Sequence, residues 1–286
     1  MPFDLDRIQE STRKVEKFLR KNPRQPSSEV IHDLRTSTRT LETAFETLGL
    51  DHKKSVRRLI GDLNEVRKRA GKVRDMDVLT EDALTVRQKG EQACHVKLVE
   101  HLGVKRDKFA RKLRREIQAG NSSLRSNLKR SEKRLEKLLR QSDKNPDSNV
   151  GSAAAARVIQ LSTELQRPTR LTRNNLHPYR LKVKELRNVL QMSETPGDPA
   201  FLEKLGEVKD AIGEWHDWEE LILIATDLLS HGGSCKLLQH FKSTSDSKFE
   251  HALSLTKQLR QDYLKAQSKT SVPEPVILAT SAIASN

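Results

Sequence analysis

Two segments of the chain share one arrangement of a histidine and two basic residues, placed three and seven positions after it. The six residues are His32, Arg35, Arg39, His177, Arg180 and Lys184. In an α-helix, positions i, i+3 and i+7 fall within roughly 60° of arc, so each segment would present one cationic stripe. Arginine offers a fork of donors to phosphate oxygens, and lysine offers a compact charge. The stripes therefore predict the binding of a phosphate-rich anion.

A second landmark follows each stripe. Gly71 and Asp75 have the same spacing as Gly213 and Asp217. The interval from histidine to aspartate is 43 residues in the first copy and 40 in the second. Two landmarks in the same order at similar spacing indicate repeated units of several helices. We expect Asp75 and Asp217 to pair with bases of the stripes and fix their rotamers.

The composition favours an all-α protein with a polyanionic partner. Of the 286 residues 32% are charged and only 4% are aromatic, which suits long amphipathic helices. The net charge is +14, which is typical of proteins that bind polyanions. Residues 1–150 hold 36 Lys+Arg against 23 Asp+Glu, a balance of +13, whereas residues 151–286 hold 17 against 16, a balance of +1. Attraction for an anion should arise mostly in the first half.

Helical periodicity covers most of the chain and divides it into two parts. Residues 1–145 are predicted to form a first helical bundle, residues 153–268 a second, and residues 269–286 a flexible tail. The polar stretch 141–152 is predicted to be the linker. Within the two parts, we expect helix breaks near Arg74 and after Gly213.

Other chemistry has little support in the sequence. Cys94 and Cys235 belong to no CxxC pair and are predicted to be small apolar fillers. Asp75 and Asp77 could form a metal pair, but no His/Cys cluster of recognisable spacing accompanies them. We expect no catalytic residue, cofactor or metal. The chain begins without a secretory signal and has no apolar run of membrane-spanning length, so we expect a soluble cytoplasmic protein.

The duplicated histidine helix followed by Gly-x-x-x-Asp resembles the CHAD domain, the conserved histidine α-helical domain. The resemblance covers roughly residues 5–268. It implies two pseudo-symmetric helical bundles that face each other across a basic central cavity or groove, which binds inorganic polyphosphate. Many members associate with polyphosphate granules. Position by position, the six stripe residues match the family's two histidine motifs, and Asp75 and Asp217 match its aspartates.

Three further bases are candidates for the same site. Arg187 loosely extends the second stripe, and Arg57 and Arg58 could line the cavity from the helix that follows the first stripe. The first copy has Glu42 where the second has Arg187, which makes it less cationic. Many family members carry a fused hydrolase with a Glu-x-Glu-x-Lys signature, and no such motif occurs in this sequence.

Three functions remain open. The leading hypothesis is a non-enzymatic polyphosphate-binding module that binds more tightly below about pH 6.5, where histidines become protonated. The alternative is a basic helical protein associated with nucleic acid, although few aromatic residues are available for stacking. Hydrolysis of short polyphosphates is the third. Residues 105–140, with 14 bases against 4 acids, could be a solvated outer surface or an electrostatic funnel for polyanions.

Overall fold

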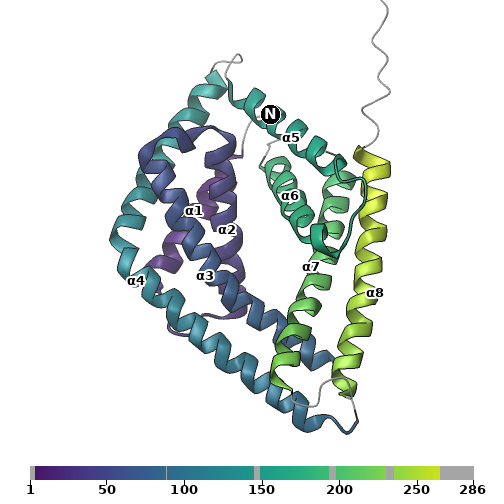
Figure 1. Cartoon of the computed structure of the whole chain (residues 1–286). Helices are drawn as coiled ribbons and strands as arrows, with labels where there is room; N and C mark the ends of the chain where they lie inside the picture. The colour runs from purple at the N-terminus through teal and green to yellow at the C-terminus, as the bar shows by residue number, and fades with distance from the viewer. Residues whose placement is uncertain (1–3, 88, 145–148, 193–197, 230–234, 265–286) are drawn as a thin grey trace, which may run out of the picture.

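The computed structural model describes residues 4–87, 89–144, 149–192, 198–229 and 235–264. These residues form helices joined by short connections, and no strand occurs among them, which confirms the all-α prediction (Figure 1). The α-helices are α1 (Leu5–Lys21), α2 (Ser28–Thr47), α3 (Lys54–Thr85), α4 (Gln92–Lys144), α5 (Asn149–Gln166), α6 (Arg173–Gln191), α7 (Pro199–Leu228) and α8 (Lys236–Leu259). A 3-10 turn, Leu50–His52, precedes α3, and a π turn, Arg260–Leu264, follows α8.

The two stripe-bearing helices, α2 and α6, begin at polar residues that satisfy free backbone groups. The Ser27 side chain accepts a hydrogen bond from the Val30 backbone N–H at 3.3 Å, which caps α2. At the start of α6, the Thr172 backbone N–H donates to the Asn175 side chain at 2.7 Å. Pro178 is the sixth residue of α6 and lies inside the helix, so its missing N–H removes the helical hydrogen bond to the Asn174 carbonyl. Both helices therefore start just before their histidines.

The buried apolar side chains of the described residues form three clusters. The first is built almost entirely from α1 to α4, and the second from α5 to the π turn. The third joins the end of α3 and the start of α4 to the end of α7 and the start of α8, and includes Met76, Leu98, Trp218 and Phe241. The two halves of the chain are thus connected by a shared core as well as by the polypeptide. Figure 1 shows the first half on one side and the second on the other, with α3 and α7 meeting near the third cluster.

The predicted helix breaks near Arg74 and after Gly213 are wrong. α3 continues from Lys54 to Thr85 and α7 from Pro199 to Leu228. An interior glycine costs a helix about 1 kcal/mol relative to alanine. The buried side chains on both sides of each position, such as Val73 and Trp215, outweigh that cost by tertiary packing.

The linker predicted at residues 141–152 is also shorter than expected. α4 extends to Lys144 and α5 begins at Asn149, so helix occupies both ends of that stretch. Polar residues can continue a helix that is already formed, because adding a residue is far less costly than nucleation. Residues 145–148 and the predicted tail at 269–286 lie outside the described residues.

Candidate polyanion-binding site

The first stripe lies on the face of α2 opposite its core face. Ile31, Leu34, Leu41 and Phe45 are buried in the first cluster. His32 is exposed, and Arg35 and Arg39 are partly buried. The helical period thus separates an apolar face from a cationic one, as the sequence indicated.

The second stripe has the same relation to the core of the second half. Leu176, Tyr179, Val183 and Leu186 are buried on one face of α6. The stripe residues His177, Arg180 and Lys184 are partly buried on another. Because α2 contacts α6 directly, bases of the two helices are close in space.

Lys184 shows how closely they approach. Burial and the positive charges of Arg180, Arg39, Arg35 and Lys209 lower the pKa of its ammonium to about 7. Unit charges influence one another strongly only over short distances in a partly shielded protein. The charges of bases on α2, α6 and α7 therefore all act on this side chain. We call the five residues the basic cluster: Arg35, Arg39, Arg180, Lys184 and Lys209.

The stripe histidines border this cluster and are held mainly in their neutral forms. Burial, together with Arg74, lowers the pKa of His32, and Lys209 adds a smaller effect of the same sign. Burial also lowers the pKa of His177, and His216 of α7 lowers it further. The rings of His177 and His216 lie 4.2 Å apart between centroids. His177 Nδ1 is buried without a hydrogen-bond partner, so it retains an unused polar atom.

Glycines give the stripe arginines room against the next helix. Arg35 lies over Gly71 of α3, where an added Cβ would be 3.9 Å from the guanidinium carbon. Arg180 lies much closer to Gly213 of α7, where the same carbon would be 2.9 Å from an added Cβ. Arg180 Nε also donates a hydrogen bond to the Lys209 carbonyl at 2.9 Å. Gly213 is therefore needed for the approach of Arg180, whereas an alanine methyl group would fit beside Arg35 at position 71.

Arg187, seven residues after Arg180, also packs over a glycine of α7. It lies over Gly206, seven residues before Gly213, and its Nε donates to the Leu202 carbonyl at 3.3 Å. Its second contact is with Gln191, at 3.2 Å. Arg187 thus packs α6 against α7, and the cluster around Lys184 is formed without it.

The motif aspartates lie beside the stripe arginines. Asp75 Oδ1 is 3.5 Å from a terminal nitrogen of Arg35. Burial raises the pKa of Asp75, whereas Arg35 opposes that increase. Burial raises the pKa of Asp217 to about 7, and the charge of Arg180 acts in the opposite direction. Asp75 is therefore ion-paired with Arg35, whereas Asp217 is affected by the charge of Arg180.

Asp77 has a different partner from Asp75. It is 9% exposed, and Arg106 of α4 donates to it at 2.5 Å. This ion pair connects α3 to α4. It also occupies the Asp77 carboxylate, which was one member of the possible metal-binding pair Asp75 and Asp77. Among the described residues, no group of three or more His, Cys, Asp or Glu side chains could hold a metal ion.

Arg57 and Arg58 are not part of the cluster. Both are exposed in the first turn of α3. Arg57 Nε donates to the Asp51 carbonyl at 3.2 Å, and Arg58 acts on the pKa of Asp62. The helical period allowed these bases to point either inward or outward, and tertiary structure places them outward.

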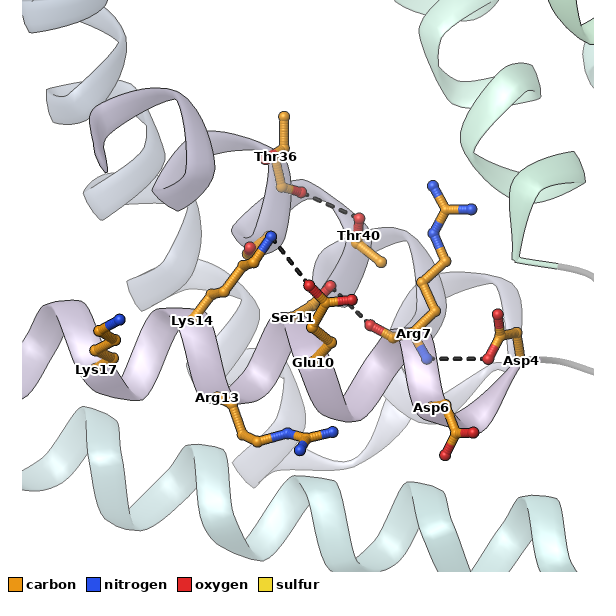
Figure 2. Close-up of a pocket in the computed structure, with 11 residues that line it drawn as sticks. Asp4, Asp6, Arg7, Glu10, Ser11, Arg13, Lys14, Lys17, Thr36 and Thr40 are labelled. Carbon is orange, nitrogen blue, oxygen red and sulfur yellow. Dashed lines mark hydrogen bonds and ion pairs between the residues drawn. The ribbon is translucent and has the colours of Figure 1, made fainter. Parts of the chain in front are cut away.

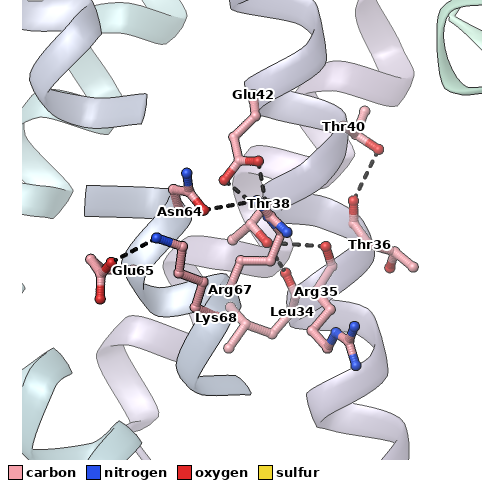
Figure 3. A network of polar contacts seen from close by, with 10 residues as sticks. All are labelled: Leu34, Arg35, Thr36, Thr38, Thr40, Glu42, Asn64, Glu65, Arg67 and Lys68. Carbon is pink, nitrogen blue, oxygen red and sulfur yellow. Dashed lines mark hydrogen bonds and ion pairs between the residues drawn. The ribbon is translucent and has the colours of Figure 1, made fainter. Parts of the chain in front are cut away.

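Glu42 is accommodated by a local network (Figure 3). The Glu42 carboxylate is buried and accepts from Arg67 Nε at 2.9 Å. Arg67 also donates to Asn64 at 2.8 Å. The negative charge of Glu42 is therefore balanced by Arg67 of α3, within the first half of the chain.

An open pocket of about 1090 Å³ adjoins the first stripe, between α1 and α2 (Figure 2). The hydroxyl-bearing residues Thr36, Ser37 and Thr40 of α2 line one side. The α1 side carries both signs of charge, and its residues include Arg7, Lys14 and Glu10. Lys14 is already paired with Glu10 at 3.1 Å, so this pocket is less cationic than the basic cluster.

Three basic residues near the stripes were not predicted from the sequence: Lys209, Arg74 and His216. A signal was present for each. Lys209 stands four residues before Gly213, on the same helical face. Arg74 and His216 occupy the same position relative to Gly71 and Gly213, immediately before the motif aspartates. The second landmark thus contributes bases as well as carboxylates.

Comparison with known families assigns the chain to one of them. The family model described as the CHAD domain matches residues 7–225. The match covers most of the chain, and the protein therefore belongs to the CHAD family. No curated protein matches the chain at a significant level. No helix in the described part of the chain is both long and apolar enough to cross a bilayer.

Proposed function

We propose that this CHAD-family protein is a non-enzymatic binding module for inorganic polyphosphate. The observation that carries the proposal is the basic cluster, in which burial and the charges of bases from three helices lower the pKa of Lys184 to about 7. Such a concentration of like charge is unfavourable in the free protein. A chain with a charge on every phosphate would relieve it and accept hydrogen bonds from the arginines.

We infer that the cluster lines a recess open to water. Such a recess would correspond to the basic central cavity that resemblance to the CHAD domain implies. Asp75 supports this inference, because its side chain is 51% exposed while the surrounding protein still raises its pKa. Arg35 is similarly 30% exposed. A recess of this kind would admit a slender polyanion and remain charged in its absence.

We also interpret the two halves as pseudo-symmetric copies. The contacts of Arg35 with Gly71 and of Arg180 with Gly213 support this interpretation. The two copies would then bring equivalent helices, α2 and α6, to the two sides of one anion. Granule association would follow from affinity for long polyphosphate.

The alternative, a nucleic-acid-associated protein, finds less support. The aromatic residues Tyr179 of α6 and Trp215 of α7 are buried, and Trp215 packs against Phe249 at 5.4 Å between ring centroids. Buried rings cannot stack on exposed bases. Hydrolysis also lacks support, because the carboxylates near the cluster interact with arginines and offer no metal-binding group among the described residues.

Binding isotherms test the proposal. The motif variant R35Q/R180Q/K184Q removes three cluster charges, and the control variant K236Q/K242Q/K257Q removes three exposed charges of α8. We expect the motif variant to lose at least about tenfold in affinity for long-chain polyphosphate, because each charged hydrogen bond contributes about 1.5–3 kcal/mol. The control variant should bind like the unaltered protein.

Salt and competition complete the test. The logarithm of the affinity should fall linearly with the logarithm of the salt concentration. Duplex DNA should displace polyphosphate only at large excess. Equal losses in the motif and control variants, or no binding by a folded protein, would contradict the proposal. Circular dichroism and thermal melting establish that each variant is folded.

A further inference from the structure

The outward face of α4 carries many exposed bases, and it lies outside the basic cluster. α4 is 53 residues long and lies along the edge of the first half (Figure 1). Its exposed bases are Lys108, Arg111, Lys112, Arg115, Arg125, Lys129, Arg130, Lys133, Arg134, Lys137 and Arg140. From residue 108 to residue 140 an α-helix rises about 48 Å, at about 1.5 Å per residue. The bases therefore form an extended surface.

Helical geometry gathers many of these bases on one side. Leu113, Leu124 and Leu135 are buried and mark the core face of α4. At about 100° per residue, Lys133 and Lys137 lie roughly opposite that face. The contacts of α4 with α1 and α3 involve its core face, and Lys133 and Lys137 are exposed to solvent on the opposite side.

Few carboxylates balance the charge of this surface. The ion pairs of α4 found among the described residues are Arg140 with Glu136, Arg106 with Asp77, and Glu116 with Arg69 of α3. In the same part of the chain, ten of the eleven exposed bases named above, all except Arg140, have no carboxylate within 4 Å. Like charges three or four residues apart destabilise a helix slightly. A surface needed only for solubility normally mixes both signs of charge.

We propose that the outward face of α4 is a second polyphosphate-binding surface, which holds the part of a long chain that extends beyond the basic cluster. This inference rests on the proposed function. It identifies long polyphosphate as the preferred ligand, because a chain held at the cluster meets α4 at a high effective concentration. A short chain would occupy one surface only.

The shape of the surface favours a flexible chain over nucleic acid. Phe109 is the aromatic residue of α4, and it is partly buried against the core beneath the ammonium of Lys72, 5.8 Å from the ring centroid. This face therefore offers no ring for base stacking. A helix that reads duplex DNA inserts into the major groove, whereas α4 is flanked by α1 and α3. A flexible polyanion can follow a convex ridge of this kind.

The test uses an α4 variant, K129Q/K133Q/K137Q, beside the motif and control variants. All three lysines are exposed, and glutamine is a good helix former, so the fold should be retained. We expect affinity for long-chain polyphosphate to fall about tenfold and the salt slope to decrease by about 2–3, because three fewer phosphates are neutralised. Affinity for tripolyphosphate should remain unchanged.

The outcomes separate the two proposals. Unchanged affinity of the α4 variant for long chains, or an equal loss in the control variant, would overturn the second surface while leaving the cluster intact. Loss of tripolyphosphate binding in the α4 variant would also overturn it, since short chains should not require α4. If duplex DNA bound more tightly than long-chain polyphosphate, and this binding depended on the α4 lysines, the choice of polyphosphate as the ligand would be overturned. If the folded protein binds neither polyphosphate, the proposed function itself fails.

Discussion

The two stripe-bearing helices, α2 and α6, pack against their neighbouring helices through different contacts. In α6, Arg180 and Arg187 lie seven residues apart and pack over two glycines of α7, also seven residues apart. In α2, Arg35 packs over Gly71, but the residue seven positions after it is Glu42, which pairs with Arg67 of α3. One helix pair is held by arginines that donate to backbone carbonyls, and the other by an ion pair.

The difference affects how firmly each arginine is held. Arg180 is close to Gly213 and bonded to the Lys209 carbonyl at 2.9 Å. Arg35 has more room above Gly71, and its contact with Asp75 is long, 3.5 Å. We infer that Arg180 is a preorganised anion contact, whereas Arg35 can adjust to a ligand. Substitutions in the two helix pairs should therefore have unequal effects.

The largest effect on stability should come from Glu42→Ala. The substitution leaves Arg67 without its carboxylate and removes a negative charge that acts on the partly buried Arg39. Loss of one member of a buried pair costs about 3 kcal/mol. Arg187→Ala, the matched change in α6, should cost only about 1 kcal/mol, since it removes hydrogen bonds to neutral groups. Chemical denaturation of both variants measures the difference. Equal destabilisation would contradict the contrast between the two helix pairs.

The next effect concerns the two glycines and is seen in binding. Gly213→Ala should displace Arg180 and weaken polyphosphate binding about tenfold, the loss expected for one charged hydrogen bond. Gly71→Ala places a methyl group at an ordinary contact distance from Arg35, so binding should change little. Gly71→Ala should also stabilise α3, by up to about 1 kcal/mol of helix propensity. Equal affinities of the two variants would show that Arg180 needs no such positioning.

A smaller effect is expected for Lys184→Met. The pKa of Lys184 lies near 7 in the folded protein, below the ordinary value of 10.5, so the folded state binds this proton more weakly than the unfolded state. The wild type should therefore lose stability as the pH falls from about 10 towards 7. The variant lacks this loss and should be more stable by about 1 kcal/mol at pH 6, while binding polyphosphate less well. Thermal melts across this pH range measure the difference. Identical pH profiles of stability for the wild type and Lys184→Met would contradict the prediction.

The smallest effect is the pH dependence of binding itself. Between pH 8 and pH 6, affinity should rise several-fold as Lys184 gains a proton and Asp217, with a pKa of about 7, loses its negative charge. Both changes favour an anion. The pKa values of the stripe histidines are lowered, so their contribution should appear only below pH 6.5. Isotherms at several pH values check this order, and the dependence above pH 6.5 should be flatter in Lys184→Met. A rise confined to pH below 6.5 would assign it to the histidines instead.

Several features could be predicted from residue order because they depend on local periodicity. Spacings of three, four and seven residues placed Ile31, Leu34 and Leu41 on one face of α2 and the stripe on another. The Gly-x-x-x-Asp landmarks marked the helices that face the stripes, although the role of each glycine was not apparent. Helix ends were less predictable, since packing carries α3 through Arg74 and α7 through Gly213.

The sequence by itself determined an all-helical, strongly basic CHAD-family chain with two amphipathic stripe-bearing helices, because helix formation and facial separation follow from nearby residues. Tertiary structure alone decided which bases gather around Lys184, because Lys209 joins Arg35 and Arg39 there while Arg57 and Arg58 remain at the surface. It also decided that Glu42 neutralises Arg67. These outcomes depend on how distant helices cross, and the distances between their charges arise only when the chain packs.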